Sequence, residues 1–171
     1  MASQKKMDAI ALLKQDHRKV EDLFEQFEKA REEGRKEKLA KQICTELMIH
    51  AMIEEEIFYP ACAGQIKDED LLDESYVEHD GAKVLIAEIM NGGPSDEYYD
   101  AKVKVLQEEI EHHVEEEEKR LEGLFAQARK ADLDLDGLGQ QLASRKAELA
   151  EQFKASGIPT PRLTTMDEVS V

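Results

Sequence analysis

Apolar residues recur at intervals of three and four along most of the chain, the period of helices that bury one face. The pattern predicts helices over about residues 8–33, 35–63, 70–90, 95–131 and 136–155. Asp8 and Ser95 are suitable N-cap residues, and Gly34 and the NGGP turn at 91–94 are expected to end helices. The expected fold class is therefore all-α.

Four long amphipathic helices with short connections predict an up-down-up-down four-helix bundle over residues 1–131. The shorter helix at 132–156 is expected to pack on the bundle or extend from it, and the polar residues 157–171 are expected to form a mobile tail. With 36% charged residues and only 4 prolines, the composition also suits helices with one solvated face.

Histidine and glutamate interrupt the apolar seams of four of these helices. In the second helix the seam reads Ile43, Leu47, His50, Glu54, Ile57. Polar residues occupy equivalent seam positions in the other three helices at His17, His79, His113 and Glu117. Each of the two His-x-x-x-Glu pairs places both side chains on one helix face, one turn apart. We expect the six side chains to meet inside the bundle.

A buried carboxylate costs several kcal/mol unless it is paired, and Lys83 is the one basic residue in these seams. A bound cation would compensate the carboxylates. Imidazole and carboxylate without thiolate suit iron, manganese or zinc, and bundle interiors accommodate two-metal carboxylate centres. Two glutamates able to bridge and four histidines indicate a di-iron site, whereas structural zinc closes at four ligands.

Other interpretations remain open for single residues. A lone histidine on an apolar face is usually a hydrogen-bonded core residue, and runs such as EEEE at 115–118 are usually solvated helix faces. The helical period selects Glu54 and Glu117 from the acidic runs and places His112 about 100° away from His113, at the rim or in solvent. Core packing is the expected role of four aromatic residues, Phe24, Phe27, Phe58 and Phe125.

The charge excludes several partners. The chain has 39 acidic and 23 basic residues and a formal charge of -16, which disfavours binding to nucleic acid or an anionic membrane. The first 17 residues lack the apolar run of a secretory signal or membrane span, so a cytoplasmic location is expected. Cys44 and Cys62 have no Cys-x-x-Cys partner and are expected to be free thiols.

Four segments resemble the helices of the hemerythrin-like family, the HHE cation-binding domains: DHRKVEDLF (16–24), HAMIEEEIFYP (50–60), EHDGAKVLIAEI (78–89) and HHVEEEE (112–118). The resemblance covers about residues 8–130. It implies two non-haem iron ions, joined by an oxo or hydroxo bridge, inside a four-helix bundle. The implied metal ligands are His17, His50, Glu54, His79, His113 and Glu117, with the two glutamates bridging.

One position departs from the oxygen-carrying members, which have a second histidine four residues after the one in the third helix. Lys83 occupies that position here. Carriers also commonly use an aspartate five residues after the last histidine, where this chain has Glu118, whereas Glu117 fits the bacterial pattern. A site with one histidine fewer leaves coordination positions open, and Lys83 or Glu21 could also approach the metals.

The leading expectation is a protein that binds dioxygen or a related small oxidant for sensing, storage, delivery or iron homeostasis. The first alternative is a di-iron enzyme with peroxidase-like or iron–sulfur repair activity. The second is a structural acidic bundle with loose cation binding. Ferritin-like iron oxidation fits less well, because those sites use Glu-x-x-His rather than His-x-x-x-Glu.

Overall fold

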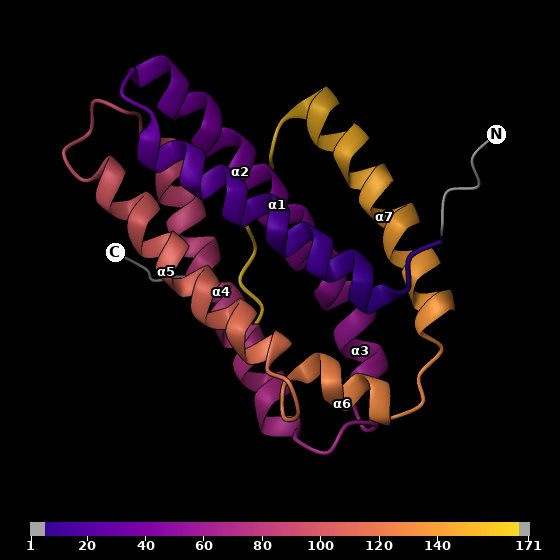
Figure 1. The fold of residues 1–171 in the computed structure, drawn as a ribbon. Helices are drawn as coiled ribbons and strands as arrows, with labels where there is room; N and C mark the ends of the chain where they lie inside the picture. The colour runs from indigo at the N-terminus through magenta and orange to yellow at the C-terminus, as the bar shows by residue number, and fades with distance from the viewer. Residues whose placement is uncertain (1–5, 168–171) are drawn as a thin grey trace.

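A computed structural model describes residues 6–167, and no strand occurs among them. Four helices form the bundle, α1 (Ala9–Lys29), α2 (Glu33–Ile53), α4 (Glu69–Asn91) and α5 (Tyr99–Glu118) (Figure 1). A π-helical turn, η1 (Glu54–Phe58), and α3 (Tyr59–Cys62) continue α2, and α6 (Leu124–Lys130) and α7 (Leu135–Ser156) follow the bundle. This confirms the all-α four-helix bundle with an additional C-terminal helix. Residues 1–5 of the predicted bundle domain and 168–171 of the predicted tail lie outside the described residues.

Several predicted helix ends shift by a few residues. The Asp8 carboxylate accepts a hydrogen bond from the Ala11 N–H at 2.8 Å and caps α1, as predicted. The first helix ends at Lys29 rather than near residue 33, because Ala30 is extended (φ -69, ψ 140). Gly34 lies in the first turn of α2, where it does not break the helix. The fourth helix begins at Tyr99 rather than directly after Ser95.

The prediction of one continuous helix over 95–131 is wrong. α5 ends at Glu118, Lys119 turns to ψ 129, and the chain re-enters a helix at Leu124. Leu121, which the helical period assigns to the buried seam, is 68% exposed. The turn requires Gly123, since a Cβ there would lie 2.6 Å from the Lys119 carbonyl oxygen. The break folds α6 under the end of the bundle and buries Phe125 there.

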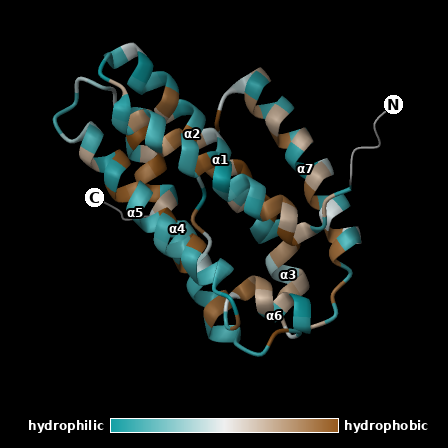
Figure 2. Ribbon diagram, viewed as in Figure 1, coloured by the Kyte–Doolittle hydropathy of each residue, from teal (hydrophilic) through white to brown (hydrophobic). Residues whose placement is uncertain are grey.

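The inward faces of the helices form one apolar core. In Figure 2, hydrophobic residues, coloured brown, alternate with hydrophilic ones, coloured teal, along the bundle helices. All four phenylalanines assigned to core packing are buried, Phe24, Phe27, Phe58 and Phe125. Cys44 and Cys62 are also buried and form no disulfide, as expected. No helix within residues 6–167 combines the length and the apolar character that crossing a membrane requires.

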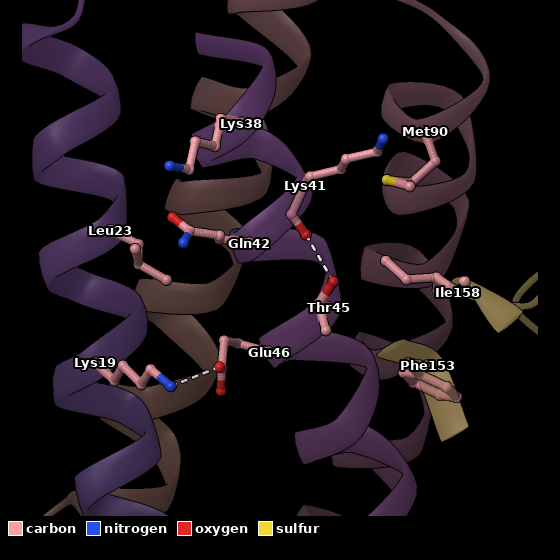
Figure 3. Close-up of a pocket in the computed structure, with 11 residues that line it drawn as sticks. Lys19, Leu23, Lys38, Lys41, Gln42, Thr45, Glu46, Met90, Phe153 and Ile158 are labelled. Carbon is pink, nitrogen blue, oxygen red and sulfur yellow. Dashed lines mark hydrogen bonds and ion pairs between the residues drawn. The ribbon is translucent and has the colours of Figure 1, made fainter. Parts of the chain in front are cut away.

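α7 packs against α1, α2 and η1 on the outside of the bundle. Its last turns and the following residues border a surface groove of about 640 Å³, in which Phe153 and Ile158 lie beside Thr45 and Met90 (Figure 3). From there the chain crosses the bundle to α4 (Figure 1), where residues 164–166 contact Asp80. Residues 157–171 have no helical period, so the sequence pattern does not predict these contacts with α4.

Candidate metal centre

The six residues selected from the seams come together in the middle of the bundle. Each is between 0% and 8% exposed. Their ligating atoms form two groups, each within 4.8 Å: His17, His50 and Glu117 in one, and Glu54, His79 and His113 in the other. Each group therefore offers two imidazoles and one carboxylate. Each half of the chain supplies the histidines of one group: α1 and α2 supply His17 and His50, and α4 and α5 supply His79 and His113.

Each glutamate lies between the two groups. Glu54 Oε1 is 2.9 Å from His50 Nε2 and 3.4 Å from His79 Nε2. Glu117 Oε1 is 3.3 Å from His17 Nε2 and 3.2 Å from His113 Nε2. Each carboxylate thus approaches one histidine of each group, as a carboxylate that bridges two metal ions must do.

Three carboxylate oxygens in this cluster lack a hydrogen-bond partner among the described residues. They are fully buried: Glu54 Oε1, Glu54 Oε2 and Glu117 Oε1. The Nε2 atoms of the neighbouring imidazoles lie 2.9 to 3.4 Å from Glu54 Oε1 and Glu117 Oε1, but a neutral imidazole with its proton on Nδ1 has none there to donate. An unsatisfied buried polar atom is costly, and a charged one more so. A cation between the two carboxylates and the four Nε2 atoms would supply the missing partner, so the donor set fits a metal centre.

A second layer of carboxylates surrounds the histidines. Every Nδ1 lies 2.8 to 3.0 Å from a different carboxylate, Glu118 at His17, Asp16 at His50, Glu55 at His79 and Glu78 at His113. A carboxylate at Nδ1 fixes the proton there and leaves Nε2 as the ligating atom that points inward. The imidazoles are thereby oriented toward the centre before any metal binds.

These outer carboxylates were not predicted from the sequence, although they occupy regular positions. Asp16 directly precedes His17, and Glu55 directly follows Glu54. Glu78 and Glu118 repeat these two positions in the second half of the chain. Each of the four is the sequence neighbour of an inner residue and contacts a histidine of another helix. An acidic residue recurring directly beside a seam histidine or glutamate was therefore the sequence feature that could have predicted them.

Three of the outer carboxylates also contact a lysine or arginine, Lys146 at Asp16, Arg18 at Glu118 and Lys83 at Glu55, and the fourth, Glu78, contacts the His112 imidazole. Burial alone would raise the pKa of Asp16, Glu55 and Glu118, but their imidazole partners and these cations hold each pKa below its ordinary value. Lys146 comes from α7, which shows how the C-terminal helix supports the site.

Three polar residues near the seams stay outside the inner cluster. The His112 side chain is 63% exposed, as expected for the rim. Glu21 pairs with Arg18 at 3.2 Å rather than approaching the centre. Lys83 is buried, and its Nζ lies 3.0 Å from Glu55 and 3.4 Å from Asp80. Lys83 therefore belongs to the outer layer.

Tyr59 lies in the inner cluster and was not predicted. Its hydroxyl donates to Glu117 Oε2 at 3.0 Å and is 3.2 Å from His79 Nε2. The Tyr59 N–H donates to the Glu54 carbonyl, five residues earlier. In an α-helix the N–H of Phe58, four residues after Glu54, would make this bond. The π-helical turn therefore brings Tyr59 to the helix face that Glu54 occupies. Burial, with the charges of Glu117 and Glu54, raises the pKa of Tyr59 well above its usual value, so the hydroxyl keeps its proton.

The cluster holds protons when no metal is bound. Burial alone would lower the pKa of His50, but the charge of Glu54 and the hydrogen bond that His50 Nδ1–H donates to Asp16 outweigh it and raise the pKa to about 10. The pKa of His113 is raised well above its usual range in the same way by Glu117. At neutral pH both imidazoles are therefore cations, and these protons compensate the buried glutamates.

Metal binding is accordingly expected to release protons. A ligating imidazole must be neutral, so adding Fe²⁺ without oxygen to metal-free protein at pH 7 should acidify a weakly buffered solution in proportion to the metal bound. A pH-indicator dye measures the proton release at each step of a titration with Fe²⁺. We expect a smaller release per bound ion from His50→Ala and an unchanged one from His112→Ala. Stoichiometric binding without acidification would show that these imidazoles are already neutral in the metal-free protein, contrary to this expectation.

A small cavity of about 30 Å³ borders the four histidines. Its remaining lining is mostly aliphatic, including Val20, Leu47, Ile86, Ile110 and Val114. Such a space holds about one water-sized molecule. The larger groove of Figure 3 lies on the surface and is lined by none of the six inner residues.

Comparison with known proteins gives three matches. The sequence profile described as the hemerythrin HHE cation binding domain matches residues 8–125. The crystal structure of a hemerythrin HHE cation binding domain-containing protein from Mycobacterium kansasii superposes with a TM-score of 0.73 at 21% identity, covering 89% of this chain and 95% of that one. A protein of Nostoc sp. named DNA nickase is 29% identical over 110 residues, which are 64% of this chain and 31% of that protein.

Proposed function

Because the chain belongs to the hemerythrin HHE cation-binding domain family, we propose that it holds two non-haem iron ions inside the bundle and binds dioxygen or a related small oxidant there. The observation that carries the proposal is the pairing of two groups of ligating atoms around buried glutamate oxygens that lack any other partner. Six ligands of this kind in two groups suit a pair of ions better than one ion.

The assignment of roles follows from the contacts. One ion would take His17 and His50, the other His79 and His113, and both would share Glu54 and Glu117. Each ion would then have four protein ligands, which leaves positions open in an octahedral sphere. Iron held there would supply the redox chemistry that a small oxidant requires.

The surroundings of the cluster support a small ligand. The adjoining cavity of about 30 Å³ is too small for an organic substrate. Its aliphatic lining favours an apolar diatomic molecule over a charged one. The Tyr59 hydroxyl, which lies 3.2 Å from His79 Nε2 and donates to Glu117 Oε2, is a neutral polar group beside the ligating atoms.

DNA cleavage is not part of the proposal. The chain spans only 31% of the length of the Nostoc protein named DNA nickase. Protein–DNA affinity comes largely from cationic side chains on phosphates, and this chain has a formal charge of -16.

The proposal is tested by loading metal-free protein with Fe²⁺ under anaerobic conditions, counting the bound iron, and then adding either dioxygen or hydrogen peroxide. We expect about two irons per chain and an absorption change on exposure to dioxygen that Glu117→Ala lacks. Reversal of that change on removing dioxygen would indicate binding. Repeated consumption of peroxide above the rate of free iron would support the enzyme alternative instead. Iron binding at the level of the Glu117→Ala variant would contradict the proposal.

A further inference from the structure

Asp80 is fully buried although it carries a charge. It follows His79 in α4, and its carboxylate accepts hydrogen bonds from three consecutive residues near the C-terminus. The N–H groups of Thr164, Thr165 and Met166 bond to it at 2.8, 2.7 and 3.1 Å, and the Thr165 hydroxyl adds a fourth bond at 2.7 Å. We call residues 164–166 the latch.

The latch also reaches the outer layer of the metal centre. The Thr164 hydroxyl donates to Glu55 Oε1, and Lys83 Nζ lies 3.1 Å from the same hydroxyl oxygen. Glu55 Oε2 in turn accepts the hydrogen bond from His79 Nδ1 at 3.0 Å. The latch therefore connects to a histidine of the inner cluster through a single carboxylate.

The other three histidines are supported differently. Their carboxylates are Asp16, Glu78 and Glu118, and the side chains paired with these, Lys146, His112 and Arg18, come from helices. None of these carboxylates has a hydrogen bond or ion pair with residues 157–167. Within the part of the chain that the structure describes, only the support of His79 depends on a segment outside the helices.

Lys83 links the two sets of contacts. Its ammonium lies between Asp80, Glu55 and the Thr164 hydroxyl, at 3.4, 3.0 and 3.1 Å. With the latch removed, Asp80 would lose its four hydrogen bonds and draw more strongly on Lys83, and Glu55 would lose the Thr164 hydroxyl bond and be free to turn away from His79. Closing the latch therefore holds Glu55 in the position that orients the imidazole.

We propose that the latch and the metal centre are coupled: docking of residues 164–166 on Asp80 strengthens metal binding by the group of Glu54, His79 and His113, and metal binding holds the latch closed. This inference rests on the proposed metal site. The coupling is reciprocal, because two events that stabilise the same arrangement must strengthen each other by the same factor. The C-terminal segment then reports whether metal is bound, as it detaches more often when the site is empty.

The experiment measures hydrogen exchange of the three latch amides in the full-length protein, metal-free and with Fe²⁺ under anaerobic conditions, and metal affinity by chelator competition in the same samples. We expect metal to slow exchange at residues 164–166. Asp80→Asn turns amide hydrogens toward the latch N–H groups, so it should speed exchange without metal and weaken metal binding about 10-fold.

Glu78→Gln is the matched control. It removes the carboxylate that supports His113 in the same metal group but makes no contact with the latch. It should weaken metal binding to a similar degree while leaving the exchange of the latch amides in metal-free protein unchanged. An equal opening of the latch in Glu78→Gln would show that exchange there follows general loosening of the bundle, and would overturn the proposal.

Thr164→Val provides a second variant if Asp80→Asn does not fold. It removes only the hydroxyl link to Glu55 and leaves the backbone bonds to Asp80, so metal affinity should fall about 2- to 10-fold, the effect of one hydrogen bond. Wild-type protein that binds metal with unchanged exchange at 164–166 would overturn the coupling and leave the metal site standing. Wild-type protein that binds no metal would overturn both.

Discussion

Replacing Glu54 by alanine is expected to reduce bound iron from about two ions per chain to less than one and to abolish the rise in melting temperature that metal produces. Glu54 is 0% exposed and contacts a histidine of each group, so its loss affects both ions. A ligand that binds only the folded state adds about 2.7 kcal/mol of stability at a hundredfold excess over Kd. Elemental analysis and thermal unfolding with and without added Fe²⁺ measure the two effects.

Glu56→Ala is the control for this variant. Glu56 lies in the same acidic run, but it points outward and pairs with Arg145 at 2.8 Å. It should retain the iron content and the metal-dependent stabilisation of the wild type. If the protein were a structural bundle without a resident metal, Glu54→Ala would change the stability by a similar amount with and without added metal. That result would remove the metal interpretation.

Replacing Phe58 by alanine is expected to lower the free energy of unfolding by about 3–5 kcal/mol, the usual cost of deleting a buried phenyl ring. Phe58 is 0% exposed and meets the Phe125 ring edge-on at 5.8 Å between centroids. Phe125 in turn stacks on the imidazole of His17 at 5.8 Å. The cavity left by the variant would therefore lie between the core and the metal centre. Urea unfolding of metal-free protein measures the loss.

Two further variants calibrate this value. Phe58→Leu keeps most of the volume and should cost clearly less than the alanine variant. Tyr98→Ala removes an aromatic ring that is 63% exposed and should change stability by less than about 0.5 kcal/mol. A loss below about 1 kcal/mol in Phe58→Ala would mean that the ring does not fill a packed core at the π-helical turn.

The arrangement of the site explains how an acidic bundle tolerates so many buried charges. Each glutamate of the inner cluster approaches two imidazoles, and each imidazole contacts an outer carboxylate at Nδ1; three of these carboxylates pair with a lysine or arginine. Charges thus alternate in sign from the centre outward, so no carboxylate in these layers lacks a nearby cation when the imidazoles are protonated. Metal ions would replace those protons without moving the layers.

The hydrophobic pattern was sufficient to predict most of the helices and the burial of the six inner residues. In a straight α-helix the seam must face the core, so a histidine that continues an apolar series is placed as firmly as a leucine would be. His17, His50, His79 and His113 all follow this rule and lie within 8% exposure. The two His-x-x-x-Glu pairs added the expectation that the six side chains would meet inside the bundle.

The places where the helical period changes, and the distant residues that support the site, became visible in the folded chain. The π-helical turn at Glu54–Phe58 shifts the seam and brings in Tyr59, while the break at Lys119 exposes Leu121. Glu118 supports His17 from 101 positions away, and Asp80 binds the latch from more than 80. Spacing along a helix predicts which face a side chain occupies, but it carries no information about which other segment packs against that face.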